Sequence, residues 1–338
     1  MNQLSPAFGR RLRGHIWTIA PFLLGPITQR FPKNRTRYIH EVIDPERGAV
    51  AIYGDFYSTP QITKRSGIRI LLHGISSTPR SSYLAAHVRA GVQAGYDVLV
   101  LALRGALGLG DDHYHAGLTD DLHAVLQDER LNKYASIEVI GCSLGGLMAL
   151  NFVAENRDSR VKGVVAICPP TDLDVVQIHL DRPAQRVYRE AILSGLKRPY
   201  KQLWQNAMGR GLPLVADLDS VLKARSFYEW DERVVLPRFG FKSVKAYHQS
   251  VSINEEKLAN VTTPTLIIVE EADPMIPYVD LNFNALKIDG LIEVCTLSEG
   301  GHLGFPQKLN IGQAAPNGVG SQVNAWLNIQ ARTERLLQ

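Results

Sequence analysis

The pentapeptide Gly-Cys-Ser-Leu-Gly at 141–145 constrains the fold of this chain more than any other stretch of its sequence. It follows the apolar, β-branched run 137–140 and leads into a run of good helix formers that begins at Leu144. A serine on a sharp turn from strand to helix has strained backbone angles, and the crowding there admits only very small residues two positions to either side. The pattern therefore predicts a strand, a tight turn and a helix, with Ser143 as the candidate nucleophile.

A nucleophilic serine needs a base, and the base needs an acid that orients it. Asp273 follows a buried strand predicted at 265–269, and His302 lies in a glycine-rich loop after a strand predicted at 292–297. The order serine, acid, histidine is that of an α/β-hydrolase, in which each residue stands beyond the carboxyl end of a strand. Asp273 could instead simply cap the helix that follows it. The order of all three residues favours a catalytic triad of Ser143, Asp273 and His302.

Backbone donors for an oxyanion are expected in two places. The strand predicted at 68–72 runs into the loop that begins with His73 and Gly74. In an α/β-hydrolase this loop supplies one N–H group and the residue after the nucleophile supplies the other. These would be the N–H groups of Ile75 and Leu144. We expect His73 to brace the loop through its ring nitrogens rather than to act as a second base.

The remaining elements define the fold class. Antiparallel strands are expected at 37–42 and 50–57, parallel strands at 68–72, 97–103, 137–142 and 162–168, and helices near 83–94, 118–127 and 144–154. This alternation predicts a doubly wound and mostly parallel sheet. Together with the order of Ser143, Asp273 and His302 it predicts the α/β-hydrolase fold. Between 171 and 260 only helical segments are expected, such as 183–196 and 200–208. The predicted division is a core with an N-terminal arm at 1–170, a helical cap insertion at 171–260 and the rest of the core at 261–338.

The predicted cap combines basic and aromatic residues. Its basic residues are Arg182, Arg186, Arg189, Lys197, Arg198, Lys201 and Arg210, against Asp181 and Glu190, with Tyr188, Tyr200, Leu203, Trp204 and Met208 interleaved. One interpretation is solvated basic faces over a helical core. The other is a surface that receives an acyl chain or an anionic headgroup, with Trp204 in the wall of the acyl channel.

Further stretches carry a family resemblance. They are Gly14–Pro21, Arg104-Gly105, Tyr114–Gly117, Asp120–Leu122, the 141–145 turn, Asp231 through Gly240–Ser243 to Tyr247, Asp273-Pro274 and Gly300–Phe305. With them the chain resembles the α/β-hydrolases of the bacterial YheT type, their plant embryogenesis-associated relatives and the animal ABHD1/ABHD3-type lipid hydrolases. Two positions depart from that pattern: 106–108 reads Ala-Leu-Gly where such proteins carry Cys or Ser and Gly, and Ala272 stands where an acid is common. The first departure is expected to reshape the pocket wall.

Metal binding and cofactors are not expected. The stretch 111–115 has residue types that bind metals, but its spacing does not force a site. Because Tyr114–Gly117 matches a stretch that the resembled family carries without metal catalysis, we expect a structural role near the turn at Ser143. Cys142, Cys168 and Cys295 lie in or beside predicted core strands, which favours buried thiols and a reducing cytoplasm over disulfides.

Composition and the N-terminal region narrow the partners. A formal charge of +4 over 338 residues is too mild to indicate nucleic acid binding. Basic residues at 10–13 precede an apolar stretch at 16–27, but two prolines, His15 and the absence of a small-residue cleavage site argue against a signal peptide. The stretch is too short to span a bilayer. We expect an arm packed on the domain, with weak contact to a membrane surface as the alternative.

These observations predict a serine hydrolase that cleaves a small-molecule or lipid carboxylic ester, of short to medium acyl length, through an acyl-enzyme. A thioesterase or amidase with the same triad, or a non-catalytic binding protein of this fold, are the alternatives. The sequence leaves the oligomeric state open.

Overall fold

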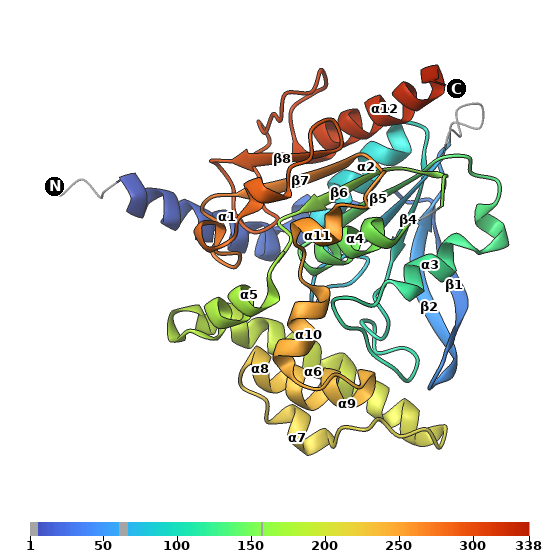
Figure 1. The fold of residues 1–338 in the computed structure, drawn as a ribbon, viewed down its shortest axis with the longest axis vertical. Helices are drawn as coiled ribbons and strands as arrows, with labels where there is room; N and C mark the ends of the chain where they lie inside the picture. The colour runs from blue at the N-terminus through green and yellow to red at the C-terminus, as the bar shows by residue number, and fades with distance from the viewer. Residues whose placement is uncertain (1–5, 61–66, 157, 338) are drawn as a thin grey trace.

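The computed structural model describes residues 6–60, 67–156 and 158–337, and these residues form an eight-stranded sheet (Figure 1). The order across the sheet is β1-β2-β4-β3-β5-β6-β7-β8. The strands are β1 (Arg35–Asp44), β2 (Gly48–Tyr57), β3 (Ile68–Leu72), β4 (Asp97–Leu101), β5 (Ile137–Cys142), β6 (Val161–Ile167), β7 (Thr265–Glu270) and β8 (Ile292–Leu297). The predicted α/β-hydrolase fold, with its mostly parallel sheet, is confirmed.

The register brings the ends of the parallel strands to one edge of the sheet. β1 pairs with β2, and β2 with β4, in antiparallel fashion, whereas β4, β3, β5, β6, β7 and β8 run parallel. Leu72 at the end of β3 pairs with both Leu101 of β4 and Gly141 of β5. Ligands in open α/β sheets bind beyond this carboxyl edge. The loops after β3, β5, β7 and β8 therefore converge there.

β4 is shorter than the predicted strand at 97–103. It ends at Leu101 because its partner β3 ends at the paired Leu72. Two residues later the Leu103 N–H donates to the ring of His73 instead of to a neighbouring strand.

Helices cover both faces of the sheet. On one face α2 (Ala85–Gln93) packs beside α12 (Val319–Leu337), and Val88 and Trp326 share an apolar cluster with Leu71. On the other face α3 (Asp120–Leu126) and α4 (Leu144–Glu155) share a cluster with Ile70. Ile70 and Leu71 serve opposite faces because successive side chains of a strand alternate.

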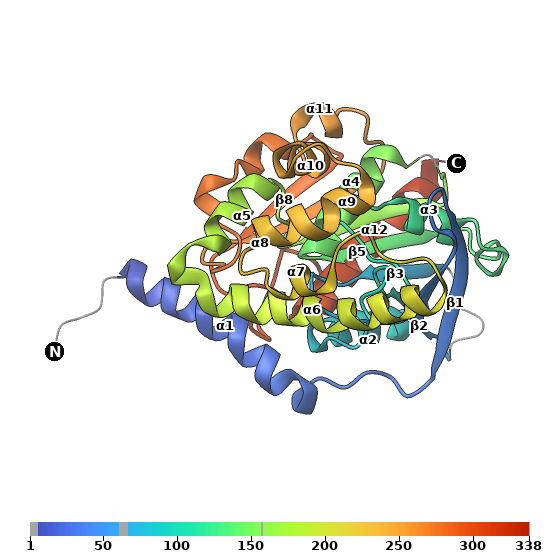
Figure 2. The same ribbon diagram turned by 90° about the horizontal axis from the view of Figure 1, so that it is seen from below.

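Seven α-helices lie between β6 and β7 within the described residues, with no strand among them. They are α5 (Leu173–Asp181), α6 (Arg186–Gly209), α7 (Leu218–Leu222), α8 (Phe227–Trp230), α9 (Leu236–Phe239), α10 (Val244–Val251) and α11 (Glu255–Leu258). Helices α5 to α10 gather below the sheet in Figure 1, and Figure 2 shows α6 to α9 in front of it. This arrangement places a helical layer over one end of the core.

Helix α6 joins two segments that the sequence suggests are separate. Pro199 lies inside it, where a proline removes a backbone hydrogen bond and crowds the carbonyl four residues earlier at a cost of about 3 kcal/mol. Leu193 and Leu196 are buried before the proline, and Tyr200 and Leu203 after it. Each buried side chain of this kind contributes about 1.5–3 kcal/mol. The free energy gained by burying side chains on both sides of Pro199 therefore exceeds the cost of the proline.

The N-terminal arm is the helix α1 (Pro6–Thr28), which packs against the short helical turn at 82–84. In Figure 2 it runs along the body beside α6. Among the described residues there is no helix with the length and apolar character that crossing a membrane requires.

Candidate active site

Ser143 occupies a strained turn between β5 and α4. Its φ of 53° and ψ of −123° lie outside the regions that side chains readily adopt. A Cβ atom on Gly141 would stand 2.1 Å from the Gly145 carbonyl oxygen, and one on Gly145 would stand 2.5 Å from that of Leu72. The glycines therefore permit the close approach of backbone segments on which the position of the Ser143 side chain depends.

A chain of hydrogen bonds starts at Ser143. Its Oγ lies 2.9 Å from Nε2 of His302, and Nδ1 of the same ring lies 2.8 Å from Oδ2 of Asp273. Because the Asp273 carboxylate can only accept a hydrogen bond, Nδ1 carries the ring proton and donates it. Nε2 is then the acceptor for the Ser143 hydroxyl. The three side chains reach this arrangement from the loops after β5, β7 and β8.

The second oxygen of Asp273 has a structural partner. Its Oδ1 accepts hydrogen bonds from the Met275 N–H at 2.8 Å and the Ile276 N–H at 3.0 Å. Asp273 thus caps the turn that follows and also holds His302, so the two interpretations of this residue from sequence are not exclusive.

The His302 loop is fixed by α1. The His302 N–H donates to Oγ1 of Thr18 at 2.8 Å. A Cβ atom on Gly301 would stand 2.3 Å from the Gly14 carbonyl oxygen, and one on Gly304 would stand 1.8 Å from that of Trp17. These close backbone contacts explain the glycines on both sides of His302.

Two tyrosines hold the loop after β3. The Gly74 N–H donates to the Tyr83 hydroxyl at 2.8 Å, and the Ser76 N–H donates to the Tyr114 hydroxyl at 3.1 Å. Among the described residues no hydrogen bond occupies the Ile75 N–H between them. At the first residue of α4, helix geometry leaves the Leu144 N–H without an intrahelical acceptor.

His73 braces this loop, as the sequence predicts. Its Nε2 accepts the Leu103 N–H at 3.1 Å, and its Nδ1 lies 2.8 Å from the Gly74 carbonyl oxygen, which it can reach only as a donor. Burial lowers the pKa of His73 to about 4. The ring is therefore neutral near pH 7.

A cavity of about 110 Å³ lies beside Ser143. Ile75, Ser143 and Leu144 form part of its wall, and mostly apolar residues of helices α5, α6 and α8, from the segment between β6 and β7, form another part. Ala106 and Gly105 also line it, so the unusual 106–108 loop does contribute to the pocket wall.

One residue of the segment predicted to form a cap lies elsewhere than predicted. Tyr200 and Leu203 of α6 line the cavity, but Trp204 does not. Trp204 follows Leu203 by one residue, which turns it by about 100° around the helix. The tryptophan in the wall is Trp230 of α8.

A family model for the alpha/beta hydrolase family matches residues 70–308, which include the whole Ser143–His302–Asp273 arrangement. The chain belongs to the alpha/beta hydrolase family.

Known members of this family resemble the chain at low identity. Phospholipase ABHD3 of Mus musculus is 24% identical over 264 residues, which cover 75% of this chain and 60% of that protein. YheT of Escherichia coli (strain K12) is 27% identical over 242 residues, covering 70% and 69% of the two chains. The match thus spans about three fifths of the mouse protein's length. The structure of Est1E from Butyrivibrio proteoclasticus has a TM-score of 0.50 and 15% identity, covering 88% of this chain and 97% of that one, and shares the fold.

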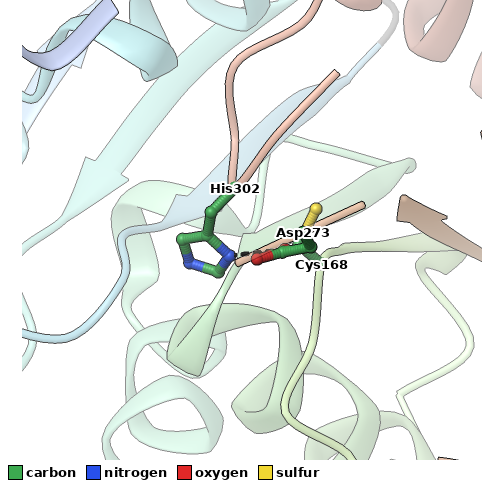
Figure 3. Close-up of side chains that lie close together, drawn as sticks. All are labelled: Cys168, Asp273 and His302. Atoms are coloured by element: carbon green, nitrogen blue, oxygen red, sulfur yellow. Dashed lines mark hydrogen bonds and ion pairs between the residues drawn. The ribbon is translucent and has the colours of Figure 1, made fainter. Parts of the chain in front are cut away.

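Next to the hydrogen-bond chain of this alpha/beta hydrolase lies Cys168, which follows β6 (Figure 3). Donor atoms of Cys168, Asp273 and His302 lie within 4.8 Å of one another. Burial and the nearby Asp273 charge raise the pKa of the Cys168 thiol well above its usual range. A neutral thiol is a poor metal ligand, and Nδ1 of His302 is already bonded to Asp273, so the group fits hydrogen bonding better than metal binding.

The three cysteines are free thiols, as predicted. Cys142 and Cys168 are buried, but Cys295 is only partly buried because β8 is an edge strand.

The 111–115 stretch has a structural role. Asp112 is buried and forms hydrogen bonds with the guanidinium groups of Arg104, at 2.8 Å, and Arg238, at 2.9 Å. Tyr114 holds the Ser76 N–H. The sequence does not reveal Arg238, Tyr83, Tyr114 or Thr18 as partners, because only the folded chain brings these residues to the site.

Proposed function

We propose that this alpha/beta hydrolase is a serine hydrolase that cleaves carboxylic esters through an acyl-enzyme intermediate. The observation that carries the proposal is the hydrogen-bond chain from Ser143 through His302 to Asp273, which ends beside an apolar cavity. A serine, a base and an orienting acid in this geometry are the components of nucleophilic acyl transfer.

In the first half-reaction Oγ of Ser143 attacks the carbonyl carbon of the ester, and its proton passes to Nε2 of His302. Asp273 keeps the imidazole in the right tautomer and stabilises the imidazolium. The negative charge that develops on the carbonyl oxygen is received by the N–H groups of Ile75 and Leu144. The two neighbours of Ile75, Gly74 and Ser76, are anchored by tyrosine hydroxyls, so the Ile75 N–H is held in place before the substrate arrives.

The tetrahedral intermediate then collapses. The bond between the carbonyl carbon and the leaving oxygen breaks, and His302 gives its proton to the departing alkoxide, which leaves as an alcohol. Water attacks the acyl-Ser143 ester with His302 again as base, and the second collapse releases the carboxylic acid and restores the serine hydroxyl.

The cavity supports an ester with a short to medium acyl chain. Its volume of about 110 Å³ is below the roughly 300–1,000 Å³ of sites for drug-sized ligands. Residues 171–260 would form a cap domain that selects the acyl chain, with 1–170 and 261–338 forming the core, because helices inserted between β6 and β7 supply the apolar wall. The phospholipase name of the mouse relative supports a lipid ester as the substrate class.

A fluorophosphonate probe tests the proposal. We expect it to label Ser143 in the folded protein, because only a base-activated serine attacks phosphorus quickly, and mass-spectrometric mapping will identify the labelled residue. Ser143→Ala should abolish both labelling and hydrolysis of p-nitrophenyl butyrate. Folded protein in which Ser143 stays unlabelled, beside a labelled reference esterase, would overturn the proposal.

A further inference from the structure

Helix α1 contacts the rest of the protein through a face of small residues. Gly14 lies against the backbone of Ala272, where an added Cβ atom would stand 2.0 Å from the carbonyl oxygen. Four residues along the helix, Thr18 accepts the His302 N–H. One turn further, the Pro21 carbonyl accepts a hydrogen bond from Oγ of Ser82, and a Cβ atom on Gly25 would stand 2.2 Å from the same Oγ. The helix therefore docks through residues 14, 18, 21 and 25.

The opposite face of α1 is apolar and exposed. With about 100° of rotation per residue, five large side chains lie within about 40° of the direction opposite Gly14: Leu12, Ile16, Ile19, Leu23 and Ile27. We call these five residues the outer stripe. Ile16 is 54% exposed, Leu23 64% and Ile27 76%, and Phe22 beside the stripe is 76% exposed. A helix on a protein surface ordinarily turns its large apolar residues inward, so α1 is oriented the other way round.

The charges of α1 are all of one sign. Its sequence from Pro6 to Thr28 contains Arg10, Arg11 and Arg13 and no acidic residue. Arg10 pairs with Glu271, whereas the other two are exposed near the start of the outer stripe. An apolar stripe flanked by arginines is the pattern of a helix that lies in the interface of a membrane with anionic lipids. A second copy of the chain fits less well, because its α1 offers no carboxylate to these arginines.

We propose that the outer stripe of α1 binds the surface of a bilayer that contains anionic lipids. The helix lies in the plane of the interface, with Ile16, Leu23 and their neighbours among the acyl chains and Arg11 and Arg13 at the headgroup phosphates. The inner face of α1 contacts the loops that carry Asp273 and His302. A helix is about 10 Å thick, so the bilayer surface would come within about that distance of these loops.

This lipid contact does not depend on the proposed hydrolysis. A role in delivering lipid esters to Ser143 rests on the proposed function, so binding is measured without any reaction.

Co-sedimentation with two kinds of vesicle tests the proposal. The full chain should sediment with vesicles of equal parts phosphatidylcholine and phosphatidylglycerol, and at least tenfold less with vesicles of phosphatidylcholine alone. The double variant Ile16→Glu with Leu23→Glu should bind anionic vesicles at least tenfold more weakly than the native chain, because its carboxylates would enter the acyl region next to anionic headgroups. Arg11→Glu with Arg13→Glu should remove the preference for the anionic vesicles.

The control is a pair of exposed isoleucines on β1, Ile39 and Ile43, which are 48% and 74% exposed. Changing both to Glu should leave vesicle binding within twofold of the native chain. The proposal is overturned if the native chain does not bind anionic vesicles. It is also overturned if the Ile16/Leu23 variant binds them as well as the native chain does. A native dimer that the Ile16/Leu23 variant converts to monomers without lipid would also overturn it, since a second copy would then cover the stripe. Thermal unfolding verifies that the variants are folded. If the Ile16/Leu23 variant does not fold, the Arg11/Arg13 variant, whose outer stripe is intact, decides whether the proposal holds.

Discussion

Asp273 bonds His302 through one carboxylate oxygen and the following turn through the other. Asp273→Asn can keep an oxygen toward the Met275 and Ile276 N–H groups while it presents an NH₂ group to Nδ1 of His302. The ring would then hold its proton on Nε2 and could not accept one from Ser143. We expect kcat to fall by about 10⁴, as in a serine protease triad, with little change in the thermal midpoint.

Steady-state kinetics on a p-nitrophenyl ester measures this loss. Asp280→Asn, the same change at an exposed position beyond the loop, should keep native turnover. Near-native kcat in Asp273→Asn would mean that another carboxylate orients His302.

Glu270 makes stability depend on pH. It is buried at the end of β7, and burial together with the nearby Asp273 charge raises its pKa to about 8, from about 4.5 in a free side chain. Between these two values the folded state binds more protons than the unfolded state, so the free energy of unfolding falls as pH rises from about 4.5 to 8.

Glu270→Gln removes this titration and keeps the shape of the side chain. The variant should therefore gain stability over the native protein as pH rises, reaching a few kcal/mol at pH 9. Urea unfolding at pH 5, 7 and 9 measures the difference, with exposed Glu271→Gln as the control. A constant difference across this range would contradict the raised pKa.

Residues that act through local geometry could be predicted from sequence, and residues that act across the fold could not. The glycines around Ser143 follow from crowding within five positions, and Asp273 and His302 follow from strand order. Thr18 accepts a hydrogen bond from the N–H group of His302, which lies 284 positions later in the sequence. Tyr83 and Tyr114 support the β3 loop with hydroxyl groups that carry no sequence signature. Only the packed structure brings such partners together.

At the scale of elements, α6 is positioned by a glycine. A Cβ atom on Gly195 would stand 2.8 Å from Cβ of Ser76, in the loop that presents the Ile75 N–H. Gly195→Ala should push this loop and α6 apart and lower kcat/KM roughly tenfold, which corresponds to about 1.4 kcal/mol. Gly209→Ala on the same helix meets no atom within 4 Å. It should keep native kcat/KM, and better helix propensity should leave the thermal midpoint unchanged or raised.

Equal kcat/KM for the two alanine variants would show that the contact between Gly195 and Ser76 does not position the site. Strand positions were predictable here because four of the strands, β3, β4, β5 and β7, are buried along their whole length and are therefore mostly apolar. The continuity of α6 through Pro199 could not be predicted from the sequence, because it depends on tertiary burial on both sides of the proline.

At the scale of the whole molecule, a buried charge network joins the helical layer to the sheet. Arg238 of α9 donates to Asp44 of β1 at 2.8 Å and to Asp112 at 2.9 Å, and Arg104 also bonds both carboxylates. Burial alone would raise the pKa of Asp44, but the hydrogen bond from Arg104 and two backbone N–H groups hold it below its usual value. The network thus depends on ionised carboxylates.

Arg238→Met should destabilise the protein by about 3–5 kcal/mol at pH 7, because it removes one partner from buried charges. The lowered pKa of Asp44 gives stability that is present above the unfolded value near 3.9 and is lost as pH falls below it. A carboxyl that has lost Arg238 protonates at a higher pH than in the native protein, so the difference between variant and native protein should shrink as pH falls through that range, because a protonated carboxyl no longer requires the arginine. Arg186→Met serves as the control, since its exposed pair with Glu190 contributes at most about 1 kcal/mol.

Scanning calorimetry from pH 3.5 to 7 measures both effects. We expect one unfolding transition in the native chain, because the network ties α9 to β1, and a second, earlier transition in Arg238→Met as the helices between β6 and β7 unfold before the sheet. If Arg238→Met loses no more stability than Arg186→Met, the apolar contacts alone hold the two layers together. A loss that stays constant down to pH 3.5 would instead assign the effect to lost packing of the Arg238 side chain rather than to its charge.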